Sequence, residues 1–157
     1  MTYSELFSLT GKHAVVIGAG GGIGREVARG LAAFDATVTV ADRNGVAARE
    51  TAELIGSGRG IELDIVDAAA VNALAAERPA DIAITTVGVN VRKRLADLTD
   101  ADFDRVLNTN LRSVFRVIQA FAPGMAERGR GACLPSPRSG PRRWSPGRGC
   151  MPHPKPA

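Results

Sequence analysis

The amino-acid sequence predicts an α/β fold in which a doubly wound parallel sheet of about four strands and four helices is followed by a disordered tail. Short runs of β-branched residues alternate with longer segments whose apolar residues recur at helical spacing through residue 128. That alternation is typical of a parallel sheet built from right-handed crossovers. The composition then changes abruptly, so we expect one domain over residues 1–128 and a tail over residues 129–157.

The first two strand–helix pairs follow directly from the pattern. Residues 13–17 (HAVVI) are predicted to form a buried strand, because all of them except the first are apolar. Residues 23–34 are predicted to form a helix, because their apolar positions repeat every three or four residues. Residues 37–41 (TVTVA) are the second expected strand, and residues 46–55 the second helix.

Two further pairs complete the predicted domain. A short strand over residues 60–63 precedes a helix that begins near Asp67, a residue type that caps helix N-termini. Residues 81–87 (DIAITTV) are the fourth expected strand. Thr99 and Asp102 have the spacing of a capping box, which predicts the start of a long helix with one apolar stripe. No partner is predicted for the outer edge of the fourth strand, and such an edge invites aggregation.

Residues 129–157 differ from the rest of the chain in composition. Seven of the nine prolines and six basic residues lie there without any acidic residue, whereas the first 128 residues carry 14 basic and 16 acidic residues. Such a segment buries too little apolar surface to order its backbone, so we expect disorder. Its charge would allow salt-sensitive nucleic-acid binding. Because Trp144 is its single aromatic residue, it offers no stacking platform, and no nucleic-acid partner is expected.

The rest of the composition excludes several classes of protein. Hydrophobic residues make up 45% of the chain and charged residues 23%, as in ordinary globular domains. Cys133 and Cys150 lack the spacing of a disulfide framework or a zinc site, so no metal is expected. No apolar run reaches membrane-spanning length, and the first residues do not resemble a signal peptide. We therefore expect a cytoplasmic protein with no membrane partner.

A glycine-rich turn joins the first expected strand to its helix. Its spaced glycines are Gly18, Gly22 and Gly24, with Ile23 between the last two. Positions without side chains let the backbone turn tightly and approach a pyrophosphate, whose charge the helix N-terminus stabilises. The alternative is a flexible loop that is merely rich in glycine. The position between a strand and a helix favours a Rossmann-type dinucleotide site.

An acidic residue ends the second expected strand. Asp42 lies 18 residues after Gly24, where a carboxylate accepts hydrogen bonds from the adenosine ribose and repels a 2′-phosphate. This favours NAD over NADP as the cofactor. Arg43 leaves NADP open, since an arginine at this place can accommodate the extra phosphate. Asp64, at the end of the third expected strand, either contacts the adenine or caps the following turn.

Together these features resemble the short-chain dehydrogenase/reductase family over roughly residues 8–130. Further matches are Asp64-Ile65 at the family's adenine contact, Thr85 to Gly88 in place of its Asn-Asn-Ala-Gly, and Asn110 on the long helix. The resemblance implies an NAD(P)-dependent oxidoreductase that moves a hydride between a nicotinamide and an alcohol or carbonyl substrate. It implies that Asn110 holds a water in a proton relay. The implied cofactor contacts are Gly18, Gly22, Ile23, Gly24, Asp42, Arg43, Asp64, Ile65, Val87 and Gly88.

The other catalytic residues of that family are absent from the chain. In the family a serine and a Tyr-x-x-x-Lys motif hold and protonate the reacting oxygen, because an alkoxide does not form at neutral pH without a positioned acid or base. Here the single tyrosine is Tyr3, and Met151 stands four positions before Lys155. The chain as it stands is therefore expected to be a truncated, inactive member of the family.

A shifted reading frame is our hypothesis for the tail. If the last base of each codon is joined to the first two of the next, the junction of Met151 (ATG) and Pro152 (CCN) must encode alanine. The junctions from Cys150 onward permit Tyr-Ala-Ala-Ser-Lys-Ala, which has the motif's spacing. The junction of Pro137 and Arg138 permits a serine 13 positions upstream of the tyrosine. An evolved basic tail is the alternative.

Two other aspects of function stay open. The chain could be a non-catalytic dinucleotide-binding or regulatory module that pairs with intact relatives through residues 100–125, since family members commonly form homo-oligomers there. The sequence does not identify a substrate. Residues 90–94 (NVRKR) place basic charge near the expected cleft, which suits either a solvated loop or an anionic substrate such as a sugar acid.

Overall fold

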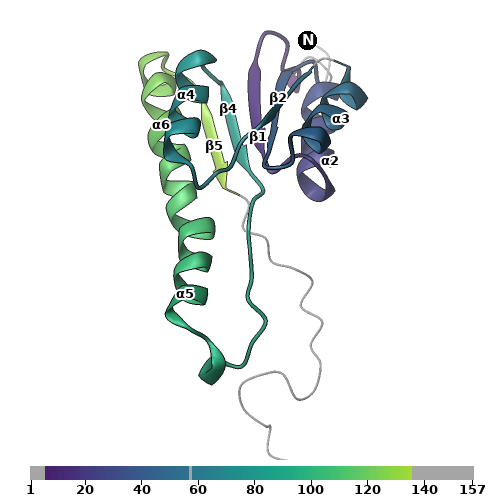
Figure 1. Ribbon diagram of the computed structural model, residues 1–157. Coiled ribbons are helices and arrows are strands. Elements are labelled where there is room, and N and C mark those ends of the chain that lie inside the picture. Colours follow the sequence, from purple (N-terminus) through teal and green to yellow (C-terminus); the bar gives the residue numbers. More distant parts are fainter. Residues whose placement is uncertain (1–5, 57, 136–157) are drawn as a thin grey trace, which may run out of the picture.

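The computed structural model describes residues 6–56 and 58–135. They form a parallel sheet in the order β3-β2-β1-β4-β5 with helices on both faces (Figure 1), which confirms the predicted doubly wound Rossmann-type α/β fold. The strands are β1 (His13–Ile17), β2 (Thr37–Asp42), β3 (Gly58–Glu62), β4 (Ile82–Thr85) and β5 (Ala132–Pro135). The helices are α2 (Gly22–Ala33), α3 (Gly45–Ile55), α4 (Ala68–Glu77), α5 (Asp100–Leu107) and α6 (Ser113–Glu127).

The core lies on both faces of the central strand β1. Successive side chains of a strand point to opposite faces of the sheet, so Val15 and Val16 belong to two different clusters, and both are fully buried. On one face α2 and α3 pack against β1 and β2, largely through alanines such as Ala28, which let helix and sheet approach closely. On the other face Phe121 and Met125 of α6 pack with residues of α4 and the sheet.

The strand β5 was not predicted. The expectation that the chain lacks secondary structure from residue 129 onward is wrong for Ala132–Pro135, which pair in parallel with β4. The backbone N–H of Ala132 donates to the Asp81 carbonyl at 2.9 Å, and Cys133 packs against the α6 side of the core. Long-range pairing here overrides local composition. It also gives β4 the edge partner that the sequence did not predict, whereas residues 136–157 lie outside the described residues, so disorder there stays a prediction.

The long helix predicted after β4 is present with one irregular turn. A π-helical turn, η2 (Asn108–Arg112), joins α5 to α6, and Figure 1 shows the combined helix extending well beyond the end of the sheet. The predicted helix starts are confirmed: Thr99 and Asp102 form a reciprocal capping box, and Asp67 caps α4 through two backbone N–H groups. Among the described residues, no helix has both the length and the apolar character needed to cross a membrane.

The capping box predicts a titration that NMR can measure. Hydrogen bonds from Lys93 and Thr99 lower the pKa of Asp102 from 3.8 to about 2. Because this pKa is lower in the folded than in the unfolded chain, the carboxylate stabilises the fold above about pH 4 and loses that contribution as pH falls toward 2. We expect the Asp102 carboxyl carbon to titrate near 2, and Lys93→Met to raise this midpoint. An unshifted midpoint near 3.8 would contradict the observed geometry.

Candidate functional site

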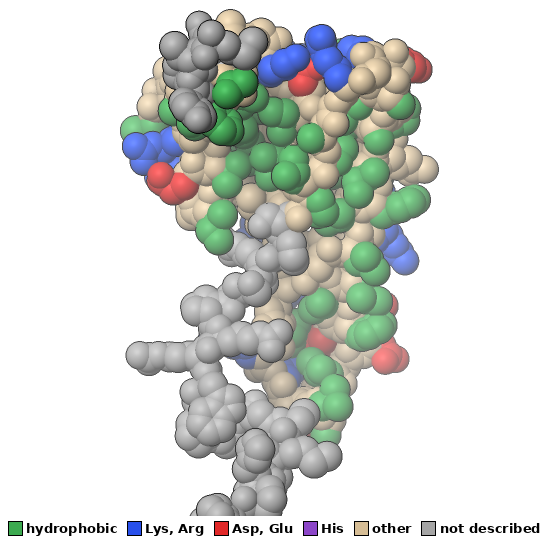
Figure 2. Space-filling model, turned by 180° about the vertical axis from the view of Figure 1, so that it is seen from behind, with side chains coloured by type: hydrophobic (Ala, Val, Ile, Leu, Met, Phe, Trp, Pro, Cys, Tyr) green, Lys and Arg blue, Asp and Glu red, His purple; other side chains and the backbone are tan. Residues whose placement is uncertain are grey.

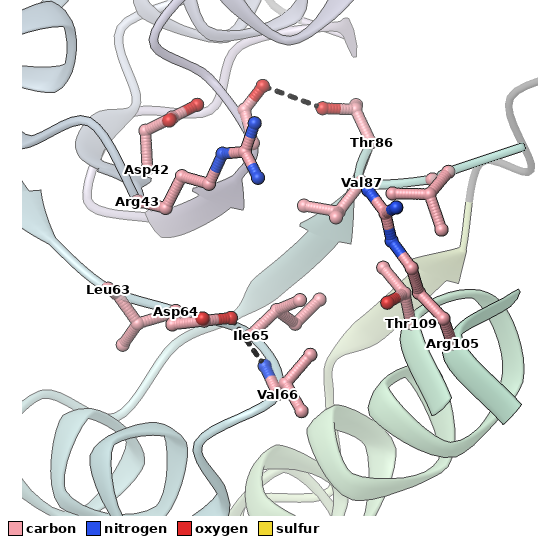
Figure 3. A pocket seen from close by; sticks show the side chains of 13 residues that line it. Asp42, Arg43, Leu63, Asp64, Ile65, Val66, Thr86, Val87, Arg105 and Thr109 are labelled. Carbon is pink, nitrogen blue, oxygen red and sulfur yellow. Dashed lines mark hydrogen bonds between the residues drawn. The ribbon is translucent and has the colours of Figure 1, made fainter. Parts of the chain in front are cut away.

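An open cavity of about 350 Å³ lies where the first four strands end (Figure 3). The chain proceeds outward from β1 to β3 on one side and to β4 and β5 on the other, so the sheet order reverses between β1 and β4. Doubly wound folds bind their ligands at this place, outside the carboxyl ends of the strands. Seven of the predicted cofactor contacts line the cavity, namely Gly18, Asp42, Arg43, Asp64, Ile65, Val87 and Gly88.

The remaining predicted cofactor contacts lie beside the cavity, in the first turn of α2. Gly22 begins the helix, Ile23 is exposed and Gly24 is buried. The residue before the helix, Gly21, provides no side-chain cap, and the first turn contains no acidic residue. The first backbone N–H groups of a helix have no partner within it, so this N-terminus can accept an anion.

Two glycines of the turn are required by its geometry. Gly18 has a φ of 89°, a left-handed conformation that side chains disfavour. A Cβ added to Gly24 would press against the Gly18 carbonyl oxygen and lie 2.6 Å from the Thr86 hydroxyl oxygen and 2.8 Å from the Ala19 Cα. The turn therefore packs directly under the start of α2, which leaves its outer side accessible to a ligand.

Asp42 lies against the glycine turn. One carboxylate oxygen accepts a hydrogen bond from the Gly20 N–H at 2.9 Å, and the other accepts one from the Asn44 N–H at 2.9 Å. A carboxylate oxygen can accept more than one hydrogen bond, so both retain capacity for a ribose hydroxyl. Gly20 is a site residue that sequence reasoning missed. The consecutive glycines at positions 20–22 were the available signal, and the structure explains Gly20, because a Cβ there would lie 2.8 Å from the Asp42 Cγ.

Thr86 is a second residue that the sequence did not assign to the site. It follows β4 and is almost fully buried. Its hydroxyl donates to the carbonyl oxygens of Gly18 at 3.0 Å and Ile17 at 3.3 Å, and the first of these contacts is dashed in Figure 3. A threonine thus links β4 to the glycine turn. In the family that the sequence resembles, this position is usually an asparagine.

Asp64 serves the turn after β3, one of the two roles that the sequence left open. Its Oδ1 accepts a hydrogen bond from the Val66 N–H at 2.9 Å (Figure 3). The carboxylate is otherwise exposed, and Ile65 next to it is buried and lines the cavity. The second carboxylate oxygen of Asp64 makes no hydrogen bond among the described residues, so it keeps its capacity to accept one from a ligand.

Basic side chains lie at two sides of the cavity. Arg43 is on the same side as Asp42, and Arg105 of α5 is on the opposite side (Figure 3). The basic segment over residues 90–94 contributes less charge than its sequence suggests. Lys93 forms an ion pair with Asp102 at 2.6 Å, and Arg94 forms one with Asp97 at 2.7 Å. These pairs favour the interpretation of this segment as a solvated loop.

Asn110 does not line the cavity. It lies in the π-helical turn η2, where its Oδ1 accepts from the Val89 N–H and its Nδ2 donates to the Val89 carbonyl, both at 2.8 Å. This two-point contact connects the long helix to the segment after β4, next to Val87 and Gly88. The side chain therefore positions a cavity wall, and its place in a proton relay stays a prediction.

A family model and curated relatives identify the family of this chain. A family model described as short chain dehydrogenase matches residues 12–134. Galactitol 2-dehydrogenase from Rhizobium johnstonii is 37% identical over 143 residues, which cover 85% of this chain and 56% of that protein. The chain thus spans about half the length of the curated relatives it matches.

The solved structures that are similar to this chain include two dehydrogenases. A short-chain type dehydrogenase/reductase from Mycobacterium marinum has a TM-score of 0.81 and 30% identity over 86% of this chain and 59% of that one. A gluconate 5-dehydrogenase from Burkholderia cenocepacia, in complex with NADP and tartrate, has a TM-score of 0.79 and 30% identity over 85% of this chain and 56% of that one. In both cases the similarity extends over most of the chain.

Proposed function

Because the chain belongs to the short-chain dehydrogenase family, we propose that it is the dinucleotide-binding part of an NAD(P)-dependent oxidoreductase acting on an alcohol or carbonyl substrate. The observation that carries this proposal is the convergence of the glycine turn, the α2 N-terminus and Asp42 at one cavity. When bound, a nicotinamide dinucleotide supplies or accepts the hydride. The residues of this chain bind and orient it.

The donor and acceptor groups of the cavity fit such a cofactor. The turn and the uncapped α2 N-terminus offer backbone N–H groups to a pyrophosphate. Asp42 offers carboxylate oxygens to ribose hydroxyls, and Asp64 and Ile65 lie where we propose the adenine contact. Val87 and Gly88, after β4, line the cavity, and Val87 packs directly against Gly18. A Cβ on Gly24 would displace the glycine turn. A turn that excludes side chains in this way supports binding of the pyrophosphate by backbone N–H groups.

We further propose that NAD is preferred over NADP. Asp42 is held by two backbone N–H groups with its charge at the cavity, where it repels a 2′-phosphate. Against this, Arg43 lies next to it, and NADP is bound in the structure of the Burkholderia cenocepacia relative. The negative charge of Asp42 therefore favours NAD, the positive charge of Arg43 favours NADP, and the preference depends on which effect is larger.

Asp42→Asn tests this balance. The amide keeps the size of the side chain but removes the charge, so we expect the ratio of NADPH to NADH affinity to rise by at least about tenfold. Calorimetric titration with each dinucleotide measures the ratio. Glu62→Gln is the matched control, since Glu62 is an exposed acid at the end of β3, and it should leave the ratio unchanged. An unchanged ratio in Asp42→Asn would contradict the NAD preference.

The chain as it stands is proposed to bind the cofactor without turning over a substrate. Its single tyrosine, Tyr3, precedes the described residues, and no Tyr-x-x-x-Lys motif occurs in the sequence. Without such a group the reacting oxygen lacks a positioned acid or base, which contributes about 10²–10⁴ to the rate of such reactions. Measurable alcohol oxidation by the purified chain would overturn this inactivity. The second candidate is a regulatory, dinucleotide-binding module that pairs with intact relatives, and co-purification with a full-length relative would be needed to support it.

Homo-oligomer formation through the long helix is part of the proposal. The helix carries an exposed apolar stripe that includes Phe103, Leu111 and Phe115, each more than 60% exposed. Figure 2 shows hydrophobic side chains continuing down the length of this helix. A contiguous apolar surface of this kind marks a protein interface.

Leu111→Glu is expected to convert an oligomer to a monomer without unfolding it, because a charge in the middle of an apolar interface is left unpaired. Light scattering after gel filtration measures the mass. Leu54→Glu is the matched control: Leu54 lies on α3, on the other face of the sheet, and is 65% exposed, close to the 64% of Leu111. If both variants keep the mass of the original chain, the stripe is not the interface.

A further inference from the structure

Gly20, in the middle of the glycine turn, is fixed from both sides by charged side chains. Its N–H donates to Asp42 Oδ2 at 2.9 Å, and its carbonyl oxygen accepts from Arg25 Nη2 at 2.6 Å. The two peptide groups that flank the Gly20 Cα are thus each held by a charge-assisted hydrogen bond, the stronger kind in proteins. Both backbone dihedrals of Gly20 are restrained as a result.

Arg25 has a second contact that connects the turn to another helix. Its Nε donates to the Thr51 hydroxyl at 2.9 Å, and Thr51, in α3, is fully buried. A guanidinium is planar and presents its donors in a fixed arrangement, so two acceptors together determine where the group lies. Arg25 therefore ties the glycine turn to the buried side of α3.

The turn and the acid of β2 are also in direct contact. A Cβ on Gly20 would lie 2.8 Å from the Asp42 Cγ and 3.0 Å from the Ala47 Cβ. Because the space between Gly20 and the carboxylate is too small for a Cβ, and the Gly20 N–H donates to that carboxylate, a rotation of this peptide group would break the hydrogen bond or displace Asp42. The part of the site suited to a pyrophosphate and the part suited to a ribose are mechanically linked at this residue.

From these contacts we propose that Arg25 is a positioning residue of the dinucleotide site. Through Gly20 it holds the glycine turn and the Asp42 carboxylate in one arrangement, so that both are preorganised for the same ligand. This inference rests on the proposed dinucleotide function, but it concerns a residue outside the cofactor contacts discussed above. If Arg25 is lost, NADH must restore this arrangement when it binds, and the free energy spent on doing so weakens binding.

The test uses the full chain and three variants. Arg25→Met removes both hydrogen bonds and keeps an unbranched apolar side chain in place of the aliphatic stem. Thr51→Val removes only the contact to α3, and Arg25→Lys keeps the charge without the planar pair of donors. Arg29→Met is the matched control, one turn further along α2, where, among the residues that the structure describes, Arg29 pairs with the exposed Glu26 alone. Thermal unfolding followed by circular dichroism verifies that each variant is folded, and Thr51→Val carries the test if Arg25→Met does not fold.

Two measurements are made, one of which needs no ligand. In the free protein, hydrogen exchange at the Gly20 amide, followed by NMR, should accelerate about tenfold in Arg25→Met, since the N–H is less firmly held to Asp42. NADH affinity, measured by calorimetry, should fall about tenfold in Arg25→Met and less in Thr51→Val. In an Asp42→Ala background the same Arg25→Met change should weaken binding by less than about threefold, because coupled residues are not additive.

The outcomes separate the inference from the function it rests on. If the unchanged chain binds NADH and Arg25→Met binds equally well, or if Arg25→Lys restores full affinity, the positioning role is overturned while the proposed function stands. Full rescue by lysine would mean that charge alone suffices. Additive effects of the Arg25 and Asp42 changes would also overturn the role. If the unchanged, folded chain does not bind NADH, the proposed function and this inference are both overturned.

Discussion

Gly24→Val is expected to abolish dinucleotide binding. Any Cβ at this position would collide with the Gly18 carbonyl oxygen and approach the Ala19 Cα to 2.8 Å, and both are backbone atoms of the turn itself. A branched side chain can be accommodated only if α2 moves away from the turn, which destroys the backbone cradle and costs about 1–3 kcal/mol in packing. We expect NADH affinity, measured by calorimetry, to fall by more than about 100-fold.

The same helix contains a glycine that serves as the control. A Cβ on Gly30 would meet nothing within 4 Å, and the residue is exposed in the middle of α2. Gly30→Ala should therefore leave NADH affinity unchanged and stabilise the helix by about 0.5–1 kcal/mol, through the better helix propensity of alanine. Retained binding in Gly24→Val, with the fold intact, would mean that the turn does not hold the pyrophosphate.

Restoring the reading frame after β5 is expected to produce an active oxidoreductase from a chain that we propose to be inactive. The shifted codons permit a serine near position 137 and Tyr-Ala-Ala-Ser-Lys-Ala from position 150, which is the arrangement that the family uses to protonate the reacting oxygen. With NAD and a panel of alcohols, we expect turnover at least about 10³ times that of the 157-residue chain.

Replacement of the permitted tyrosine by phenylalanine in the restored chain is the control, and it should remove the gained activity. The nucleotide sequence past codon 130 checks the premise before any assay. If its alternative frame does not encode the serine and the Tyr-x-x-x-Lys motif, the frameshift hypothesis is wrong. If the 157-residue chain itself oxidises alcohols at a comparable rate, the proposed inactivity is wrong.

Local patterns predicted most of the fold correctly because they act over short distances. The β-branched runs predicted β1, β2 and β4. The cap residues Asp67 and Thr99 predicted two helix starts, and the structure confirms both. The strand β5 could not be predicted in this way. It is only four residues long, ends in proline and is formed by pairing with β4, which is about 50 residues away in the chain.

For the candidate site, too, the sequence identified residues that short motifs mark, but not the contacts between distant residues. Motif spacing identified Gly18, Asp42 and Gly88, and the fold brings these residues to one cavity. The hydrogen bonds of Arg25 and Thr86 to the glycine turn, which orient the site, could not be predicted. Thr86 lies on a different element from the turn, and neither Arg25 nor Gly20 was one of the motif positions. For Asp64 the sequence left two roles open, and the structure shows one of them, the contact to the turn after β3.

The cavity at the carboxyl ends of the first four strands is proposed to bind a nicotinamide dinucleotide. Calorimetric titration of the purified 157-residue chain with NADH is the decisive experiment, since binding needs none of the missing catalytic groups. We expect saturable binding of one NADH per chain with a Kd of about 1 mM or tighter, competed by NAD. A chain that is folded by circular dichroism, yet produces no heat of binding with NADH or NADPH at millimolar concentration, would contradict the claim.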